Sequence, residues 1–141
     1  MSDAASERKA TKPRPRPAPE SKPYWDGARE NRLLLQRCNA CGQFWFPPSQ
    51  RCAHCLSTDF AWVETSGRGR IYSFVVFHRV YHPAFENDVP YVVAIVELDE
   101  GPRLLTNIVG AKPDDVRCDM RVRVTFEETH GITIPRFMIA A

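Results

Sequence analysis

The sequence lacks an apolar run long enough to span a membrane, and it lacks the charged-then-apolar stretch of a secretion signal. It also lacks a strong excess of either charge, because 19 Lys and Arg residues stand against 17 Asp and Glu residues, giving a net charge of +2. These absences argue against a membrane protein and against a small secreted protein built on disulfide bonds. We therefore expect a cytoplasmic protein that does not act at a membrane.

The small positive charge is concentrated in residues 1–23, where six basic residues stand against three acidic ones. The remaining chain has 13 basic and 14 acidic residues, so its body is not basic. A basic face is the first requirement of a general nucleic-acid binder, and we expect no nucleic-acid partner. Residues 1–23 also contain five prolines and no apolar periodicity, which predicts a disordered, proline-rich, basic tail.

A chain of 141 residues can form one ordinary domain, or two very small ones that share an interface. Residues 24–36 mix apolar and charged positions as an amphipathic helix does, and their end is expected to lead into a strand over 33–37. The later patterns predict strands at 60–64, 71–78, 91–98, 103–109, 121–127 and 137–139. Turns are expected at 66–70 and 99–102, with a loop or short helical turn at 111–115. A mainly β protein with a small closed barrel of the OB-fold type accommodates five such barrel strands.

Four of the five cysteines form two Cys-x-x-Cys pairs, Cys38 with Cys41 and Cys52 with Cys55, separated by ten residues. Each pair aims two sulfurs at one point, and Gly42 permits the positive φ that such a turn often needs. Four thiolates fill a tetrahedral coordination shell and leave no position for water, so the predicted ion is structural. Zinc is the first candidate. Iron in a rubredoxin-like site, with a role in electron transfer, is the alternative.

The same cysteines could form two disulfides or a thioredoxin-like redox pair. A redox motif does not need a second pair nearby, and a disulfide framework does not fit a chain without a secretion signal. The strand-like residues 43–46 and the two prolines after them form a hairpin too small to have its own core. Metal binding would supply roughly 10 kcal/mol or more of its folding free energy.

No catalytic constellation is visible, because His78, His82, His130 and Cys118 have no motif spacing to a Ser, Cys or carboxylate partner. The glycines and arginines of 67–70 could cradle a phosphate, but a turn that joins the ribbon to the first barrel strand is the better explanation of this motif. Several aromatic residues could stack nucleic-acid bases, pack in the core or line a channel for an acyl chain. They are Phe74, Phe77, Tyr81, Phe85 and Tyr91.

An ordered set of short motifs covers nearly the whole chain after the tail. The set comprises Leu35-Gln36-Arg37-Cys38, Cys41-Gly42, Phe46-Pro47-Pro48, Cys52 with Cys55, Ser66-Gly67-Arg68-Gly69, Pro90-Tyr91, Val96-Glu97-Leu98 and Pro135-Arg136-Phe137. In this order the motifs resemble the family of acyl-CoA-associated proteins in which a rubredoxin-like zinc ribbon is followed by an OB-fold. The resemblance implies a helix and zinc ribbon over 24–65 and an OB-fold over 66–141.

The resemblance also implies a function. Proteins of this family are accessory subunits of thiolase-type enzymes, including lipid-transfer-protein-like thiolases and aldolases, and of acyl-CoA hydratases, so we expect a hetero-oligomer with such a partner. The catalytic residues then belong to the partner, and the OB-fold helps to bind or guide the acyl-CoA. Arg68, Arg70 and Arg79 are candidates for the CoA phosphates because they flank the first barrel strand. A single-stranded nucleic-acid-binding protein with the same architecture is the alternative.

Three positions depart from the family pattern. Ala53 stands where a proline is frequent and Leu56 where a glycine is frequent, both in the second Cys-x-x-Cys turn. Cys118 stands where a glycine is common before the last long strand. The predicted metal ligands are intact, so these departures concern local turns.

Overall fold

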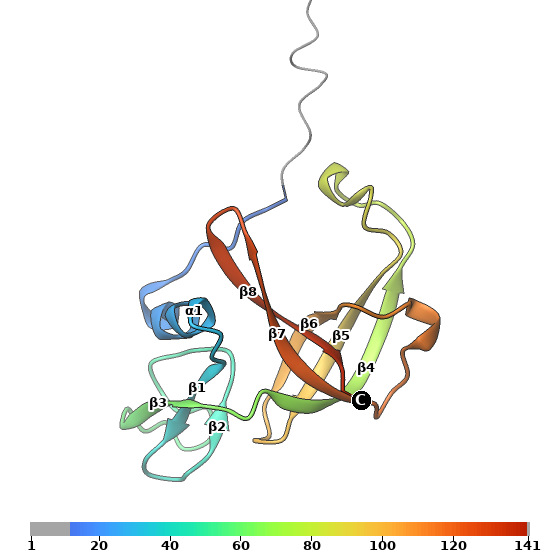
Figure 1. Cartoon of the computed structure of the whole chain (residues 1–141). Helices are drawn as coiled ribbons and strands as arrows, with labels where there is room; N and C mark the ends of the chain where they lie inside the picture. Colours follow the sequence, from blue (N-terminus) through green and yellow to red (C-terminus); the bar gives the residue numbers. More distant parts are fainter. Residues whose placement is uncertain (1–11, 141) are drawn as a thin grey trace, which may run out of the picture.

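A computed structural model describes residues 12–140 and shows a helix, a small three-stranded sheet and a barrel, in that order along the chain (Figure 1). The helix is α1 (Lys22–Arg29). The small sheet contains β1 (Leu34–Cys38), β2 (Phe44–Trp45) and β3 (Phe60–Glu64). The barrel contains β4 (Arg68–Phe77), β5 (Tyr91–Leu98), β6 (Arg103–Ile108), β7 (Arg121–Thr129) and β8 (Ile132–Ile139). Short 3-10 helices lie at η1 (Pro19–Ser21), η2 (Pro83–Phe85) and η3 (Pro113–Asp115).

The barrel is closed in the strand order β4-β5-β6-β8-β7. Its strands are antiparallel neighbours except β6 and β8, which meet in parallel at Ile108 and Phe137. Burial along β5 alternates residue by residue, with Val92, Ala94, Val96 and Leu98 facing the interior. This period-2 pattern is the reason that the strand could be read from the sequence. The predicted mainly β fold with a five-stranded barrel is confirmed.

The first barrel strand begins earlier than the sequence pattern indicates. Only Ser66 and Gly67 of the predicted 66–70 turn lie outside a strand, because β4 already starts at Arg68. Gly69 lies within the strand, and a Cβ there would overlap the carbonyl oxygen of Glu97 on β5. The glycine therefore serves close approach of two paired strands and not a turn, a role that the sequence does not distinguish.

The last strand is also longer than predicted, since β8 spans Ile132–Ile139 and not only 137–139. Pro135 lies inside it, opposite Phe126 of β7. Proline lacks the N–H that a central strand needs, which is why the pattern favours a shorter strand. On its other side, β8 registers with β6 only through Phe137 and Ile108, so Pro135 interrupts no ladder there.

The N-terminal helix packs on both sheets and ends at Arg29, so the chain extends over 30–33 before β1. Tyr24 is buried and Trp25 half-buried, with their rings edge to face at 5.1 Å between centroids. Burial raises the pKa of the Tyr24 phenol to about 12. Tyr24 belongs to the main core, and Trp25 packs against that core while remaining partly exposed.

The predicted tail falls partly outside the described residues, which begin at Lys12. Lys12 pairs with Asp88 at 2.6 Å, and its ammonium lies 5.4 Å from the centre of the Phe85 ring. The described end of the tail thus lies against the 78–90 loop. Lys22 and Pro23, at the end of the predicted tail, form the first turn of α1.

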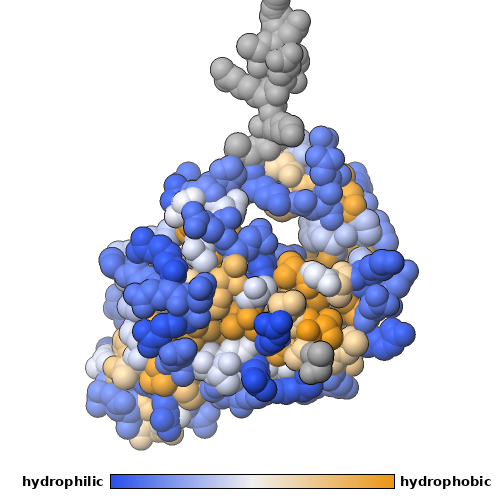
Figure 2. Space-filling model, in the orientation of Figure 1, coloured by the Kyte–Doolittle hydropathy of each residue, from blue (hydrophilic) through white to orange (hydrophobic). Residues whose placement is uncertain are grey.

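The larger of two apolar clusters joins the small sheet to the barrel. Leu33 and Leu35 belong to the same buried cluster as Ile71, Val96 and Phe137 of the barrel. Figure 2 shows apolar residues gathered in the middle of the molecule, where the barrel meets the smaller sheet, with hydrophilic residues around them. None of the described helices is long and apolar enough to cross a membrane.

Candidate functional site

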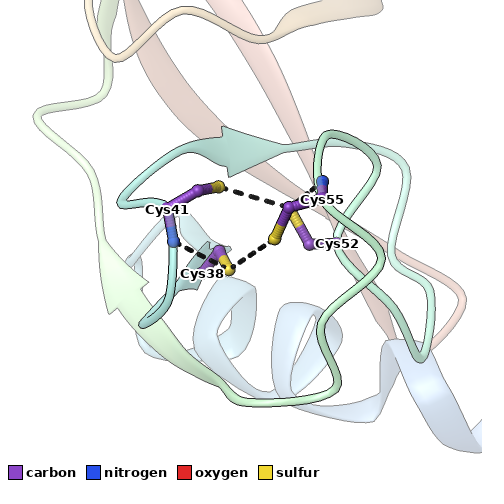
Figure 3. A group of neighbouring side chains, drawn as sticks. All are labelled: Cys38, Cys41, Cys52 and Cys55. Atoms are coloured by element: carbon purple, nitrogen blue, oxygen red, sulfur yellow. Dashed lines mark hydrogen bonds between the residues drawn. The ribbon is translucent and has the colours of Figure 1, made fainter.

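Two turns of the small sheet bring the four predicted cysteine ligands together (Figure 3). Cys38 is the last residue of β1, and Cys41 follows in a turn closed by the Gly42 amide, which donates to the Cys38 carbonyl at 2.9 Å. Cys52 and Cys55 lie in a second such turn, where the Leu56 amide donates to the Cys52 carbonyl at 3.0 Å. Each turn therefore presents two sulfurs to the same point.

The sulfur positions fit one tetrahedral ion. All four Sγ atoms lie within 4.8 Å of one another, with Cys38 to Cys55 at 3.5 Å and Cys41 to Cys52 at 3.6 Å. A zinc–sulfur bond of about 2.3 Å implies sulfur–sulfur edges of about 3.8 Å in a tetrahedron. A disulfide needs about 2.05 Å, and all four thiols are free, so the two-disulfide alternative is wrong for this structure.

Backbone amides lower the cost of placing negative sulfur here. The Cys41 amide donates to Cys38 Sγ at 3.4 Å and lowers the pKa of the Cys38 thiol to about 6. The amide of His54 donates to Cys52 Sγ at 3.3 Å. The Ser57 amide lowers the pKa of the Cys55 thiol, but the hydrogen bond shared with Cys38 and the burial outweigh it and raise that pKa to about 12. Four clustered sulfurs thus compete for protons, a conflict that a divalent cation removes.

A buried glutamine ties the loop between the two cysteine turns to the sheet. Gln36 is 1% exposed, its Nε2 donates to the Ser49 carbonyl at 2.7 Å, and its Oε1 accepts from the Ser49 amide at 2.9 Å. The Trp45 indole donates to the Ser49 hydroxyl at 3.0 Å. Sequence reasoning assigned Gln36 no role, although one polar residue after three leucines is a signal of a buried hydrogen-bonding group.

The departure at Leu56 lies in strained backbone. Leu56 has φ +67 and a side chain that is 66% exposed. A glycine adopts this conformation without steric cost, which explains why glycine is frequent there. The turn is closed all the same, so the substitution leaves the cysteine geometry intact.

The three arginines predicted to bind CoA phosphates do not form one site. Arg68 and Arg70 lie at the start of β4, and Arg79 lies beyond the other end of that ten-residue strand. At about 3.3 Å per residue, the two ends are roughly 30 Å apart. Arg79 lies over the ring of Tyr81, with 5.3 Å to its centroid, and Arg70 forms ion pairs with Glu97 and Asp119. That these arginines bind the CoA phosphates stays a prediction.

The histidines and the fifth cysteine do not assemble a catalytic group among the described residues. His82 accepts from the Ala84 amide at 3.0 Å and caps η2. His78 and His130 are exposed on different connections, before η2 and between β7 and β8. Cys118 is exposed beside Asp119, whose carboxylate pairs with Arg70.

Most of the aromatic candidates contact one another. Phe77 and Tyr91 stack with 5.2 Å between centroids, and Tyr81 and Phe85 each pack on one of them. Phe74 packs against the main core. These rings pack on one another as one cluster and, although Tyr81 is 70% exposed, they are not separate platforms for successive bases, which counts against the alternative of a single-stranded nucleic-acid binder.

Comparison with known proteins identifies two consecutive domains. Residues 25–61 match the family described as "ChsH2, rubredoxin-like zinc ribbon domain", and residues 62–127 match "ChsH2, C-terminal OB-fold domain". A chain of a solved structure titled "Ltp2-ChsH2(DUF35) aldolase" is similar, with a TM-score of 0.82 and 43% identity, over 91% of this chain and 100% of that one.

Two curated relatives are longer proteins. A "Probable enoyl-CoA hydratase alpha subunit" of Thermomonospora curvata is 44% identical over 130 residues, which are 92% of this chain and 40% of the relative. The "Benzoylsuccinyl-CoA thiolase subunit BbsA" of Geobacter metallireducens is 36% identical over 89 residues, which are 63% of this chain and 58% of the relative. The chain thus spans about two fifths to three fifths of the length of these relatives. With a cysteine cluster in its ribbon and a closed barrel after it, the chain belongs to the ChsH2 (DUF35) family of zinc-ribbon and OB-fold proteins.

Proposed function

We propose that this chain is a zinc-containing, non-catalytic subunit that supports a thiolase- or aldolase-type partner enzyme and contacts its acyl-CoA. The observation that carries the proposal is the likeness, over 91% of this chain, to a chain of a solved aldolase assembly with ChsH2 (DUF35) in its title. The relatives named as subunits of a hydratase and of a thiolase support the same class of CoA thioester chemistry.

The side chains support an accessory role. Four thiolates around one ion leave no coordination position for substrate or water, so the ion does not act as a Lewis acid. Residues 12–140 show no nucleophile with a base and an orienting group within hydrogen-bond reach. The chemistry therefore belongs to the partner, and this chain supplies binding surface.

Zinc is the ion that we propose for the cysteine cluster. The family match is to a zinc ribbon, and four sulfurs on rigid turns suit a d¹⁰ ion without geometric preference of its own. Cys38, Cys41, Cys52 and Cys55 would hold it, and it would stabilise the ribbon without taking part in a reaction. Elemental analysis of the purified protein distinguishes zinc from iron. Its colour is a second indicator, since a rubredoxin-like iron protein is coloured and a zinc protein is colourless. The free thiols fit a reducing cytoplasm.

Co-expression tests the proposed partner. The full chain and a co-expressed thiolase- or aldolase-type protein from the same organism are expected to elute together, and the partner's activity is expected to fall without this chain. Cys41→Ser is expected to abolish co-elution because it opens the metal site, whereas the exposed Gln50→Met leaves co-elution unchanged. Two separately eluting proteins, with the partner fully active alone, would refute the proposal.

A further inference from the structure

Two pairs of arginines face each other on the neighbouring strands β4 and β7. Arg68 of β4 lies directly opposite Arg123 of β7, and Arg70 lies opposite Arg121 in the same ladder. Gly69 and Val122 between them are buried, so the four arginines share the outer face of the barrel. We name Arg68, Arg70, Arg121 and Arg123 the arginine face. Like charges directly opposite on two strands destabilise a sheet, so this arrangement opposes folding unless an anion compensates it.

Carboxylates neutralise only half of the arginine face. Arg70 pairs with Glu97 at 2.9 Å and also with Asp119. Arg121 pairs with Asp99 at 2.9 Å. Among residues 12–140, no carboxylate lies within 4.0 Å of Arg68 or Arg123. The uncompensated charge is therefore an opposed pair and not a random scatter of surface arginines.

Arg68 and Arg123 border a cavity whose lining is suited to an anion. A cavity of about 540 Å³ is lined by Arg68, Arg121 and Arg123, with Val122, Ile139 and Ala140 as its other walls. Arginine forks match phosphate oxygens in a bidentate manner, and two forks about 5 Å apart at Cβ can meet on one phosphate group. A phosphomonoester carries a charge of about −2 at neutral pH, which equals the two uncompensated positive charges.

We infer that Arg68 and Arg123 bind a phosphomonoester dianion, with Arg121 beside it. In the acyl-CoA subunit proposed above, on which this identification rests, the group is the 3′-phosphate of CoA. Arg123 takes the place of Arg79 in this phosphate site, because Arg79 lies beyond the far end of β4. The pairing of Arg70 with two carboxylates makes it a structural residue of the barrel.

A comparison of CoA with dephospho-CoA isolates this one phosphate. Calorimetric titration of the full, zinc-loaded chain is expected to show about tenfold or more tighter binding of CoA than of dephospho-CoA, because charge-assisted hydrogen bonds to the phosphate are lost in the second ligand. In the double variant Arg68→Gln with Arg123→Gln, the two ligands are expected to bind equally. The control, Arg79→Gln, removes one positive charge beyond the other end of β4 and is expected to keep the ratio.

The melting temperature separates a ligand site from a structural one. Removing two opposed positive charges relieves repulsion, so the double variant without ligand is expected to melt no lower than the wild type. A clear fall in its melting temperature would mean that the arginines support the fold, and would overturn the inference. Equal binding of CoA and dephospho-CoA by the wild type, or no binding of either, would also overturn it.

The outcomes distinguish this inference from the proposed function. Co-elution with the partner and an unaltered CoA ratio in the double variant would reject the phosphate site and leave the subunit role intact. Loss of co-elution in the double variant with an unchanged ratio would assign the arginine face to a protein partner and overturn the inference. A wild-type ratio above ten that collapses in the double variant, without any partner complex, would support the phosphate site and reject the subunit role. Displacement of CoA by a single-stranded oligonucleotide at lower concentration would assign the face to nucleic acid and overturn the inference.

Discussion

Replacing Gln36 by methionine tests whether one buried amide orders the metal-binding loop. The side chain is 1% exposed and forms two hydrogen bonds with the backbone of Ser49, at 2.7 and 2.9 Å. Methionine has a similar length and flexibility but neither a donor nor a comparable acceptor. The substitution therefore removes both bonds and leaves the Ser49 amide and carbonyl without their partner.

The expected cost follows from these two bonds. Each contributes about 1 kcal/mol, and a partly buried backbone group left unpaired adds its own desolvation penalty, so Gln36→Met should lower the free energy of unfolding by about 2 to 4 kcal/mol. Because Ser49 lies three residues before Cys52, the loosened loop should also release the ion more readily. Release to a chromophoric chelator is expected to be at least about tenfold faster.

Gln50→Met is the matched control, because Gln50 is exposed in the same loop and undergoes the same chemical change. Urea unfolding and chelator release are measured for the wild type and both variants. If Gln36→Met and Gln50→Met unfold within about 0.5 kcal/mol of each other and release the ion at equal rates, then the Gln36 bonds do not order the loop.

Four further predictions concern the metal, the barrel and pH. Cys41→Ser should reduce bound zinc well below one ion per chain and lower the melting temperature, and unchanged values for both would contradict the four-cysteine assignment. Phe137 is 0% exposed, so Phe137→Ala should lower the free energy of unfolding in urea by about 3 to 5 kcal/mol. A decrease under about 1 kcal/mol would argue against its place in the core. Gly69→Ala should lower the free energy of unfolding by about 1 to 3 kcal/mol, because the added Cβ would overlap a carbonyl oxygen of β5. An unchanged stability in urea would contradict this close contact of the two strands. Hydrogen bonds from Arg103 and Arg70 lower the pKa of the Glu97 carboxyl below its usual 4.5, so the stability that they confer is present above pH 4.5 and is lost as the pH falls through the folded-state pKa. Between pH 3 and 6 the melting temperature of Glu97→Gln should therefore depend less on pH than that of the wild type. An identical pH dependence of the two melting temperatures would contradict the lowered pKa.

The metal cluster could be predicted from the sequence because its determinants are local. Two Cys-x-x-Cys turns fix the direction of their sulfurs within four residues each, whatever the rest of the chain does. The strand over 91–98 was equally accessible because its apolar residues alternate. Alternation predicts β8 less well, because a proline and a polar threonine interrupt its apolar pattern. Pairing with β7 forms the longer strand in spite of these residues.

The arginine face could not be predicted, because it depends on register between strands far apart in the sequence. Arg68 and Arg123 are brought into opposition by the pairing of β4 with β7, and no local pattern specifies which residue of one strand meets which residue of the other. The sequence did indicate arginines near the first barrel strand. Arg79 was a candidate because it is near this strand in the sequence. The ten-residue strand nevertheless places it far from Arg68 in space.

The cysteine ribbon and the arginine face are joined by a short, hydrogen-bonded connection, so an ion in the ribbon would have an indirect role in the proposed phosphate binding. β1 places Leu35 in the core shared with the barrel and Cys38 in the metal cluster, three residues apart on the same strand. From β3, only Thr65, Ser66 and Gly67 lead to Arg68, and Thr65 donates to the Leu33 carbonyl through its amide at 2.9 Å and its hydroxyl at 3.0 Å. A connection this short and this firmly hydrogen-bonded cannot absorb a movement of the ribbon. A metal ion held by the four cysteines would therefore contribute to the proposed phosphate binding by fixing where β4 begins, and it could do so with a filled coordination shell.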